Sequence, residues 1–154
     1  MQIVLDVASG PSYYYVMRFS IKVQYGLQAL LELAENYGQG PVGIASIARR
    51  ERIPVRFLEQ LLLSLKKRGL AESVRGKQGG YSLKRSPASI SLLEVVEALD
   101  GPIELGMKGP KKSSIIREAF DNLEDTIKTE LNRTSLEKLT VKKKQKEGAI
   151  TYII

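Results

Sequence analysis

The 154-residue chain contains no cysteine, no histidine and no tryptophan. Without cysteine there is no disulfide and no thiolate nucleophile, and without histidine there is no imidazole for general acid–base catalysis. The same two absences remove the ligands that nearly every zinc or iron–sulfur site requires. The acids, lysines and tyrosines that remain show no pairing typical of a catalytic site. We therefore expect no enzymatic activity, no bound metal and no cofactor.

Long apolar segments are also absent from the sequence. No apolar run reaches the roughly 18 to 20 residues needed to span a bilayer, and the N-terminus lacks the positive start and apolar core of a secretory signal. We expect a cytoplasmic protein without a membrane partner. Hydrophobic residues make up 43% of the chain, enough for the core of one domain, or of a small domain with a dimerisation appendage.

Positive charge is abundant and concentrated in one segment. The net charge is +7 and the isoelectric point is about 9.6, which favours a polyanionic partner such as nucleic acid or an anionic membrane surface. Between Arg49 and Arg85 there are eleven Lys or Arg residues and three acids, a net charge of +8, so the rest of the chain sums to −1. Cations that only solvated a helical surface would be spread more evenly. This segment is therefore the candidate polyanion-binding region.

Two helices are predicted upstream of and at the start of this basic segment. From Ser20, a candidate N-cap, apolar residues recur at helical spacing as far as Gly38, at Val23, Leu27, Leu30, Leu31 and Ala34. A short second helix is predicted around residues 44–48, and it ends in the cations Arg49 and Arg50.

A third helix is expected to begin at Pro54, because proline is tolerated at the first helical position. Lys66-Lys67-Arg68-Gly69 close this helix with cations and a glycine. One side of the helix carries the apolar residues Val55, Leu58, Leu61, Leu62 and Leu65. The opposite side carries the polar residues Arg56, Glu59, Gln60 and Ser64. A polar helix face of this kind is what reading base edges in the major groove of DNA requires.

A basic β-hairpin, or wing, follows the third helix. Its strands are predicted at residues 72–75 and 81–84, and Arg75 and Lys77 are placed to reach the DNA backbone or minor groove. The connection contains three glycines, which can adopt positive φ and allow close backbone approach: Gly76, Gly79 and Gly80. A nucleotide-binding loop is the alternative for such glycines, but no Lys-Ser or Lys-Thr follows at Walker spacing.

The second half of the chain is predicted to be helical. Ser91 and Glu94 have capping-box spacing at the start of a fourth helix, which ends at Gly101-Pro102, and residues 104–112 are expected to be a loop. A longer helix over residues 114–132 carries an apolar stripe of Ile116, Phe120, Leu123, Ile127 and Leu131. The stripe suits a partner helix in a dimer, and the alternative is that it packs on the core of its own subunit.

The two ends of the chain are less regular in pattern. Residues 3–5 are strand-like, and the second methionine, Met17, is a candidate start for the functional domain. A short helical turn is expected at 135–139, followed by a mobile lysine-rich tail. For the apolar end at 149–154, the hypothesis is an edge strand beside residues 3–5. The predicted organisation is an N-terminal extension (1–16), a winged helix-turn-helix domain (17–101), a loop (102–113), a dimerisation helix with a short turn (114–139) and a basic tail (140–154).

Several of these motifs together resemble the Rrf2 family of bacterial winged-helix transcription regulators. The resembling segments are Met17-Arg18-Phe19-Ser20, Lys22, Tyr25-Gly26-Leu27, residues 53–62, Leu65, Gly69-Leu70, residues 73–76, Gly79-Gly80-Tyr81, residues 90–101 and residues 134–139. The resemblance implies a mainly α fold, with the third helix in the major groove, the wing at the minor groove, and a long helix crossing its partner in a homodimer. It also implies a near-palindromic operator in double-stranded DNA.

The resemblance assigns roles to some of these side chains. Arg56 and Glu59 correspond to base-reading residues of the family, and Arg75 to its wing arginine. Pro54 and Arg56 stand where serines are common in the family, so the operator sequence cannot be carried over. The full set of candidate DNA-binding residues is Lys22, Tyr25, Arg49, Arg50, Arg56, Glu59, Gln60, Lys67, Arg75, Gly76 and Lys77.

The loop after the fourth helix departs from the family pattern. Cluster-binding relatives hold three cysteines there, whereas this chain has a shorter loop without cysteine, so a cluster bound in the family's manner is excluded. Its cations Lys108, Lys111 and Lys112 suit either an anionic effector or a simply solvated basic loop. The sequence thus predicts a cluster-free, homodimeric transcription regulator, taken to be a repressor, with an unidentified small-molecule or protein effector. The alternative is a winged-helix module that acts through a partner protein.

Overall fold

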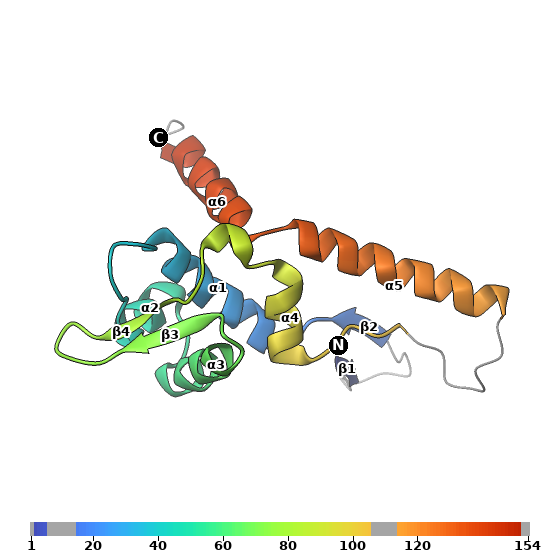
Figure 1. Cartoon of the computed structure of the whole chain (residues 1–154), viewed down its shortest axis with the longest axis horizontal. Helices are drawn as coiled ribbons and strands as arrows, with labels where there is room; N and C mark the ends of the chain where they lie inside the picture. The colour runs from blue at the N-terminus through green and yellow to red at the C-terminus, as the bar shows by residue number, and fades with distance from the viewer. Residues whose placement is uncertain (1, 6–14, 106–113, 152–154) are drawn as a thin grey trace.

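A computed structural model of the chain describes residues 2–5, 15–105 and 114–151. The described part is mainly helical, with two separate two-stranded antiparallel sheets (Figure 1). Its helices are α1 (Ile21–Glu35), α2 (Ile44–Glu51), α3 (Val55–Lys67), α4 (Leu92–Asp100), α5 (Ile115–Arg133) and α6 (Leu136–Thr151), with a short 3-10 turn, η1 (Pro87–Ser89). Its strands are β1 (Gln2–Leu5), β2 (Tyr15–Arg18), β3 (Ala71–Val74) and β4 (Gly80–Leu83). The predicted fold class, a winged helix with a long helix after it, is confirmed.

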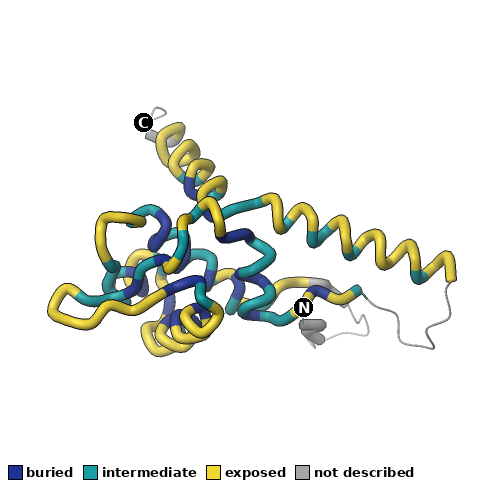
Figure 2. The backbone as a smooth tube through the Cα atoms, in the orientation of Figure 1, coloured by how far each residue is buried: buried dark blue, intermediate teal, exposed yellow. Residues whose placement is uncertain are grey.

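The core of the winged helix lies around α1. Leu30 and Leu33 of α1, Leu58 and Leu62 of α3 and Val95 of α4 are almost completely buried. Each buried aliphatic side chain stabilises the fold by about 1.5 to 3 kcal/mol relative to exposure. The buried segments gather where these helices meet, and the outer surface of α3 and most of α5 are exposed (Figure 2).

Helix starts follow the sequence, with two differences of detail. The Ser91 hydroxyl accepts from the Glu94 backbone N–H at 3.2 Å and the Glu94 carboxylate accepts from the Ser91 N–H at 3.0 Å, so the predicted capping box is present. Pro54 was predicted as the first helical residue of α3 but occupies its N-cap, so the helix begins one position later than predicted, at Val55. Ser20 is the N-cap of α1, but its hydroxyl donates to Asp100 at the end of α4 and does not cap the helix.

Both β-hairpins are short. In the wing, Ala71 pairs with Leu83 and Val74 with Gly80, so each strand begins and ends one residue earlier than predicted. At the N-terminus, β1 pairs with β2, which confirms the strand predicted at residues 3–5. The strand β2 crosses the predicted domain boundary between residues 16 and 17.

The predictions for the C-terminal segment were largely wrong. The short turn expected at 135–139 is the beginning of α6, a helix that continues to Thr151. The basic tail expected at 140–154 is therefore helical as far as Thr151. Residues 149–151 belong to this helix and not to the expected edge strand, and residues 152–154 lie outside the described residues. Leu136 is fully buried and Thr140 is almost buried, because α6 lies against α1 and η1. Burial of these residues is what makes the segment a helix in spite of its charge.

The helix α5 projects away from the rest of the chain, and α6 leaves its end in a different direction (Figure 1). Within the described ranges, none of the helices combines the length and apolar character that crossing a membrane requires.

Candidate nucleic-acid interface

The outer face of α3 is polar and exposed. The predicted face residues Arg56, Glu59 and Gln60 are all exposed, and Lys67 continues the same face near the end of the helix. Because residues at i, i+3, i+4, i+7 and i+11 share one side of a helix, Leu63 lies among them, 49% exposed. Leu63 was not predicted as a site residue, although its spacing from Arg56 would have placed it there. The face therefore offers charged and amide groups around one apolar side chain.

The basic wing stands beside this helix. Arg75, Gly76 and Lys77 are exposed between β3 and β4, so the cations are accessible to a polyanion. A side-chain contact connects the wing to α3, since Lys66 Nζ donates to Ser73 Oγ at 2.5 Å. The two elements predicted to contact DNA thus lie next to each other.

The base of the wing is joined to the loop between α1 and α2. Val42 and Tyr81 exchange two backbone hydrogen bonds, from Val42 N to Tyr81 O at 2.8 Å and from Tyr81 N to Val42 O at 2.9 Å. Gly80 permits this approach, because a Cβ there would lie 2.2 Å from the Val42 carbonyl oxygen. The close backbone approach predicted for these glycines therefore includes a contact within the protein.

The residues of α1 and α2 that were predicted to contact the DNA backbone differ in their exposure and in their ion pairs. Arg49 is exposed, and Lys22 is half-buried at the start of α1. Arg50 is exposed but forms an ion pair with Glu32 of α1 at 2.8 Å. This pairing was not foreseen from the sequence. A phosphate contact by Arg50 would compete with that carboxylate for the guanidinium.

Tyr25 has a structural contact in addition to its predicted role. Its ring meets Phe57 of α3 edge-on, with the ring centroids 5.9 Å apart. Such aromatic pairs contribute about 0.5 to 1.5 kcal/mol beyond their buried area. The contact fixes α1 against the first turn of α3.

The apolar stripe of α5 is divided between two environments. Ile127 and Leu131 are partly buried and pack against the core, as the single-subunit alternative expected. Ile116, Phe120 and Leu123 are 58%, 40% and 54% exposed. The outer part of the stripe is therefore available to a partner helix.

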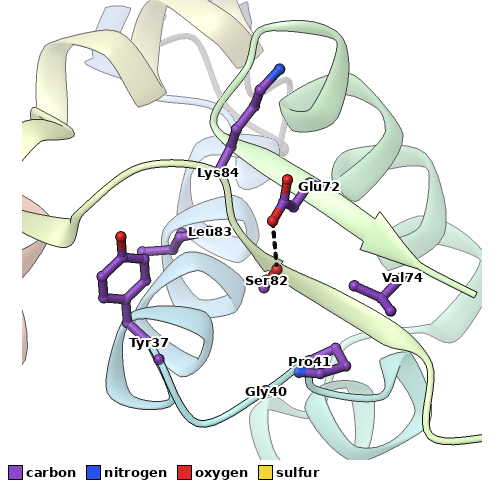
Figure 3. Close-up of a pocket in the computed structure, with 9 residues that line it drawn as sticks. Tyr37, Gly40, Pro41, Glu72, Val74, Ser82, Leu83 and Lys84 are labelled. Carbon is purple, nitrogen blue, oxygen red and sulfur yellow. Dashed lines mark hydrogen bonds between the residues drawn. The ribbon is translucent and has the colours of Figure 1, made fainter.

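A pocket of about 500 Å³ lies behind the wing (Figure 3). Between the two wing strands at this pocket, Ser82 Oγ donates a hydrogen bond to Glu72 Oε1 at 3.3 Å. The pocket lies between the end of α1, the following loop and both wing strands, and its lining residues are Tyr37, Gly38, Gly40, Pro41, Glu72, Val74, Ser82, Leu83 and Lys84. None of the predicted DNA-binding residues is among them. The cations of the predicted anionic-effector loop, Lys108, Lys111 and Lys112, lie outside the described residues.

The fold of this chain is similar to those of solved structures. The chain is similar to CymR, the global cysteine regulator of B. subtilis, with a TM-score of 0.75 and 34% identity over 82% of this chain and 98% of that one. It is also similar to the IscR of T. potens, with a TM-score of 0.67 and 33% identity over 80% of this chain and 85% of that one.

Sequence comparison gives the same relatives. The HTH-type transcriptional regulator CymR of Bacillus subtilis is 36% identical over 123 residues, which are 80% of this chain and 89% of that protein. The HTH-type transcriptional regulator IscR of Escherichia coli is 42% identical over 88 residues, 57% of this chain and 54% of IscR, so that match spans about half of IscR. Residues 19–142 match the model of Rrf2, described as an iron-dependent transcriptional regulator. The chain therefore belongs to the Rrf2 family of transcriptional regulators.

Proposed function

We propose that this Rrf2-family regulator is a cytoplasmic homodimer that binds a near-palindromic operator sequence-specifically and represses transcription without an iron–sulfur cluster. The observation that carries the proposal is the adjacency of the polar α3 face and the basic wing, joined by the contact between Lys66 and Ser73. A major groove admits one helix, and a neighbouring minor groove attracts an inserted arginine. One subunit thus has the parts to contact two successive grooves.

Recognition is divided between base and backbone contacts. Arg56, Glu59 and Gln60 can exchange hydrogen bonds with base edges, and Leu63 can contact the methyl group of thymine. The surrounding cations, Lys22, Arg49, Arg50, Lys67, Arg75 and Lys77, supply phosphate contacts that position the protein without reading sequence.

A homodimer is supported by α5. This helix is 19 residues long, so it extends over about 28 Å, and within the described part of one subunit its apolar residues Ile116, Phe120 and Leu123 are exposed. Packing this stripe against the same stripe of a second copy removes it from water. A two-fold dimer then presents two α3 helices, which is why the operator is expected to be nearly palindromic.

The residues of this chain do not fit the iron chemistry in the family's description. Cysteine and histidine are absent from the whole sequence. In the part of the chain that the structure describes, no group of three or more acidic side chains is arranged to hold a metal ion. We therefore propose that the protein answers to a signal other than a bound cluster, through a small-molecule or protein effector.

The proposal is tested by incubating the purified protein with fragments of its source genome, recovering the bound fragments and sequencing them. We expect one near-palindromic motif to be enriched upstream of a small number of genes. Enrichment that occurs only after a partner protein is added would favour an interaction module instead. Absence of any enrichment under both conditions would contradict the proposed function.

A further inference from the structure

One lysine of α6 differs from its neighbours in environment. Lys142, Lys144 and Lys146 are exposed, as a solvated basic segment would be, whereas the side chain of Lys143 is only 28% exposed. The Lys143 ammonium group lies against three carboxylates of the helix-turn-helix. Their distances from Lys143 Nζ are 3.4 Å for Glu32 Oε1, 3.2 Å for Glu35 Oε1 and 4.0 Å for Glu51 Oε1.

The central carboxylate of this cluster is also the partner of a predicted DNA-binding residue. Glu32 is only 5% exposed, and its two oxygens are shared, one with Lys143 and the other with Arg50. The cluster therefore contains three carboxylates and two cations. With both cations in place its formal charge is −1, and it becomes −2 if either cation leaves.

The pKa values of the cluster are consistent with strong mutual interaction. Burial raises the pKa of the Glu51 carboxyl, Lys143 lowers it in part, and the nearby Glu32 raises it further. Burial by itself would lower the pKa of Lys143, but the carboxylates of Glu35 and Glu32 raise it above its ordinary value. Lys143 is thus held in its charged form beside these acids.

We propose that Lys143 is a positioning residue for DNA binding, which releases Arg50 from Glu32 so that Arg50 can contact a phosphate. The inference rests on the proposed function. It gives α6 a role in DNA binding that does not require this helix to contact DNA itself. When DNA approaches, Arg50 exchanges one anionic partner for another. Lys143 remains on Glu32 and supplies the counter-charge that Arg50 gives up.

The reason lies in the burial of Glu32. Leaving a buried carboxylate without a cation costs far more than breaking an ion pair at the surface. Without Lys143, Arg50 is the cation that remains paired with Glu32 among the described residues, so the guanidinium is held in the ion pair.

The test uses the full-length chain and an operator duplex selected from the genome. We expect Lys143→Met to weaken binding on the order of tenfold and to reduce the slope of log affinity against log salt by about one, since one phosphate contact is lost. The matched control is Lys144→Met on the next residue, which is exposed and makes no contact with the cluster. We expect the control to match the wild type in both quantities.

Two further variants separate positioning from general destabilisation. In an Arg50→Gln background, adding Lys143→Met should change neither affinity nor salt slope, because the contact is already lost. Adding Glu32→Gln to Lys143→Met should restore both, because the neutral amide no longer holds Arg50. If Lys143→Met does not fold, Glu32→Gln alone is informative, and we expect it to bind about threefold more tightly than the wild type.

Each result has a distinct meaning. Wild-type affinity and salt slope for folded Lys143→Met would overturn the inference. So would a loss of affinity on adding Lys143→Met to Arg50→Gln that equals the loss it causes in the wild type. Weaker binding by Glu32→Gln alone would also overturn it. All three results leave the proposed function intact, provided that the wild type binds the duplex. Failure of the wild type to bind any selected duplex would instead overturn the proposed function.

Discussion

Substitution of Gly80 by alanine tests how the wing is held. A Cβ at this position would lie 2.2 Å from the Val42 carbonyl oxygen and 2.9 Å from the Gly43 nitrogen, both backbone atoms that cannot rotate away. The wing must therefore separate from the loop, which breaks the two hydrogen bonds between Val42 and Tyr81. At about 1 kcal/mol for each bond, with about 1 to 2 kcal/mol for the displaced packing of Tyr81, the total is about 3 to 4 kcal/mol.

Urea denaturation measures this loss as a lower free energy of unfolding, and native domains with 5 to 15 kcal/mol of stability remain folded after it. We also expect weaker DNA binding, because the displaced wing carries Arg75 and Lys77. Gly148→Ala is the control, since Gly148 lies in α6 with no atom within 4 Å of the added Cβ. It should be neutral or slightly stabilising, because alanine is the better helix former. A Gly80→Ala protein within about 0.5 kcal/mol of the wild type would refute the reasoning.

Two other predictions concern association and acid stability. Leu123→Lys should weaken the proposed dimer about 100-fold in sedimentation equilibrium, because the two leucines of the dimer each lose burial worth about 1.5 kcal/mol. Thr129→Lys, on the opposite, exposed side of α5, should leave the dimer unchanged. Equal dissociation constants for the two variants would contradict the α5 interface. Burial raises the pKa of Glu94, but hydrogen bonds from the Ser91 N–H and from Arg85 outweigh it and keep the pKa below its ordinary value of 4.5. Ionised Glu94 therefore stabilises the fold above pH 4.5, and this contribution is lost as the pH falls through the lowered pKa. The stability difference between the wild type and Glu94→Gln should shrink in acid, and a difference independent of pH would be inconsistent with the capping role.

Local sequence signals were sufficient for the winged helix. The apolar stripe of α3, the capping box at Ser91 and the glycines of the wing each act within a few residues, so the pattern alone predicts the element. The resulting polar face of α3 and the basic wing tip were predicted for the same reason. Their roles in binding DNA remain predictions.

Contacts between distant segments were not predictable in this way. A run of lysines at 142–146 suggests a solvated tail, but Lys143 is held by Glu32 and Glu35, which lie more than 100 residues earlier in the chain. The hydrogen bonds between Tyr81 and Val42 and the ion pair between Arg50 and Glu32 also depend on tertiary structure. Charge and spacing show which side chains are present, and the fold decides which of them meet.

The most direct test of the account is the salt dependence of binding to an operator duplex, measured for the wild type and for Arg75→Ala/Lys77→Ala. The account predicts a steep fall of wild-type affinity with salt, and a slope smaller by about two when both wing cations are removed. Lys142→Ala, on the exposed side of α6, should retain the wild-type slope. Equal affinities and equal slopes for the wild type and the wing variant would contradict the claim that the wing and α3 together bind DNA.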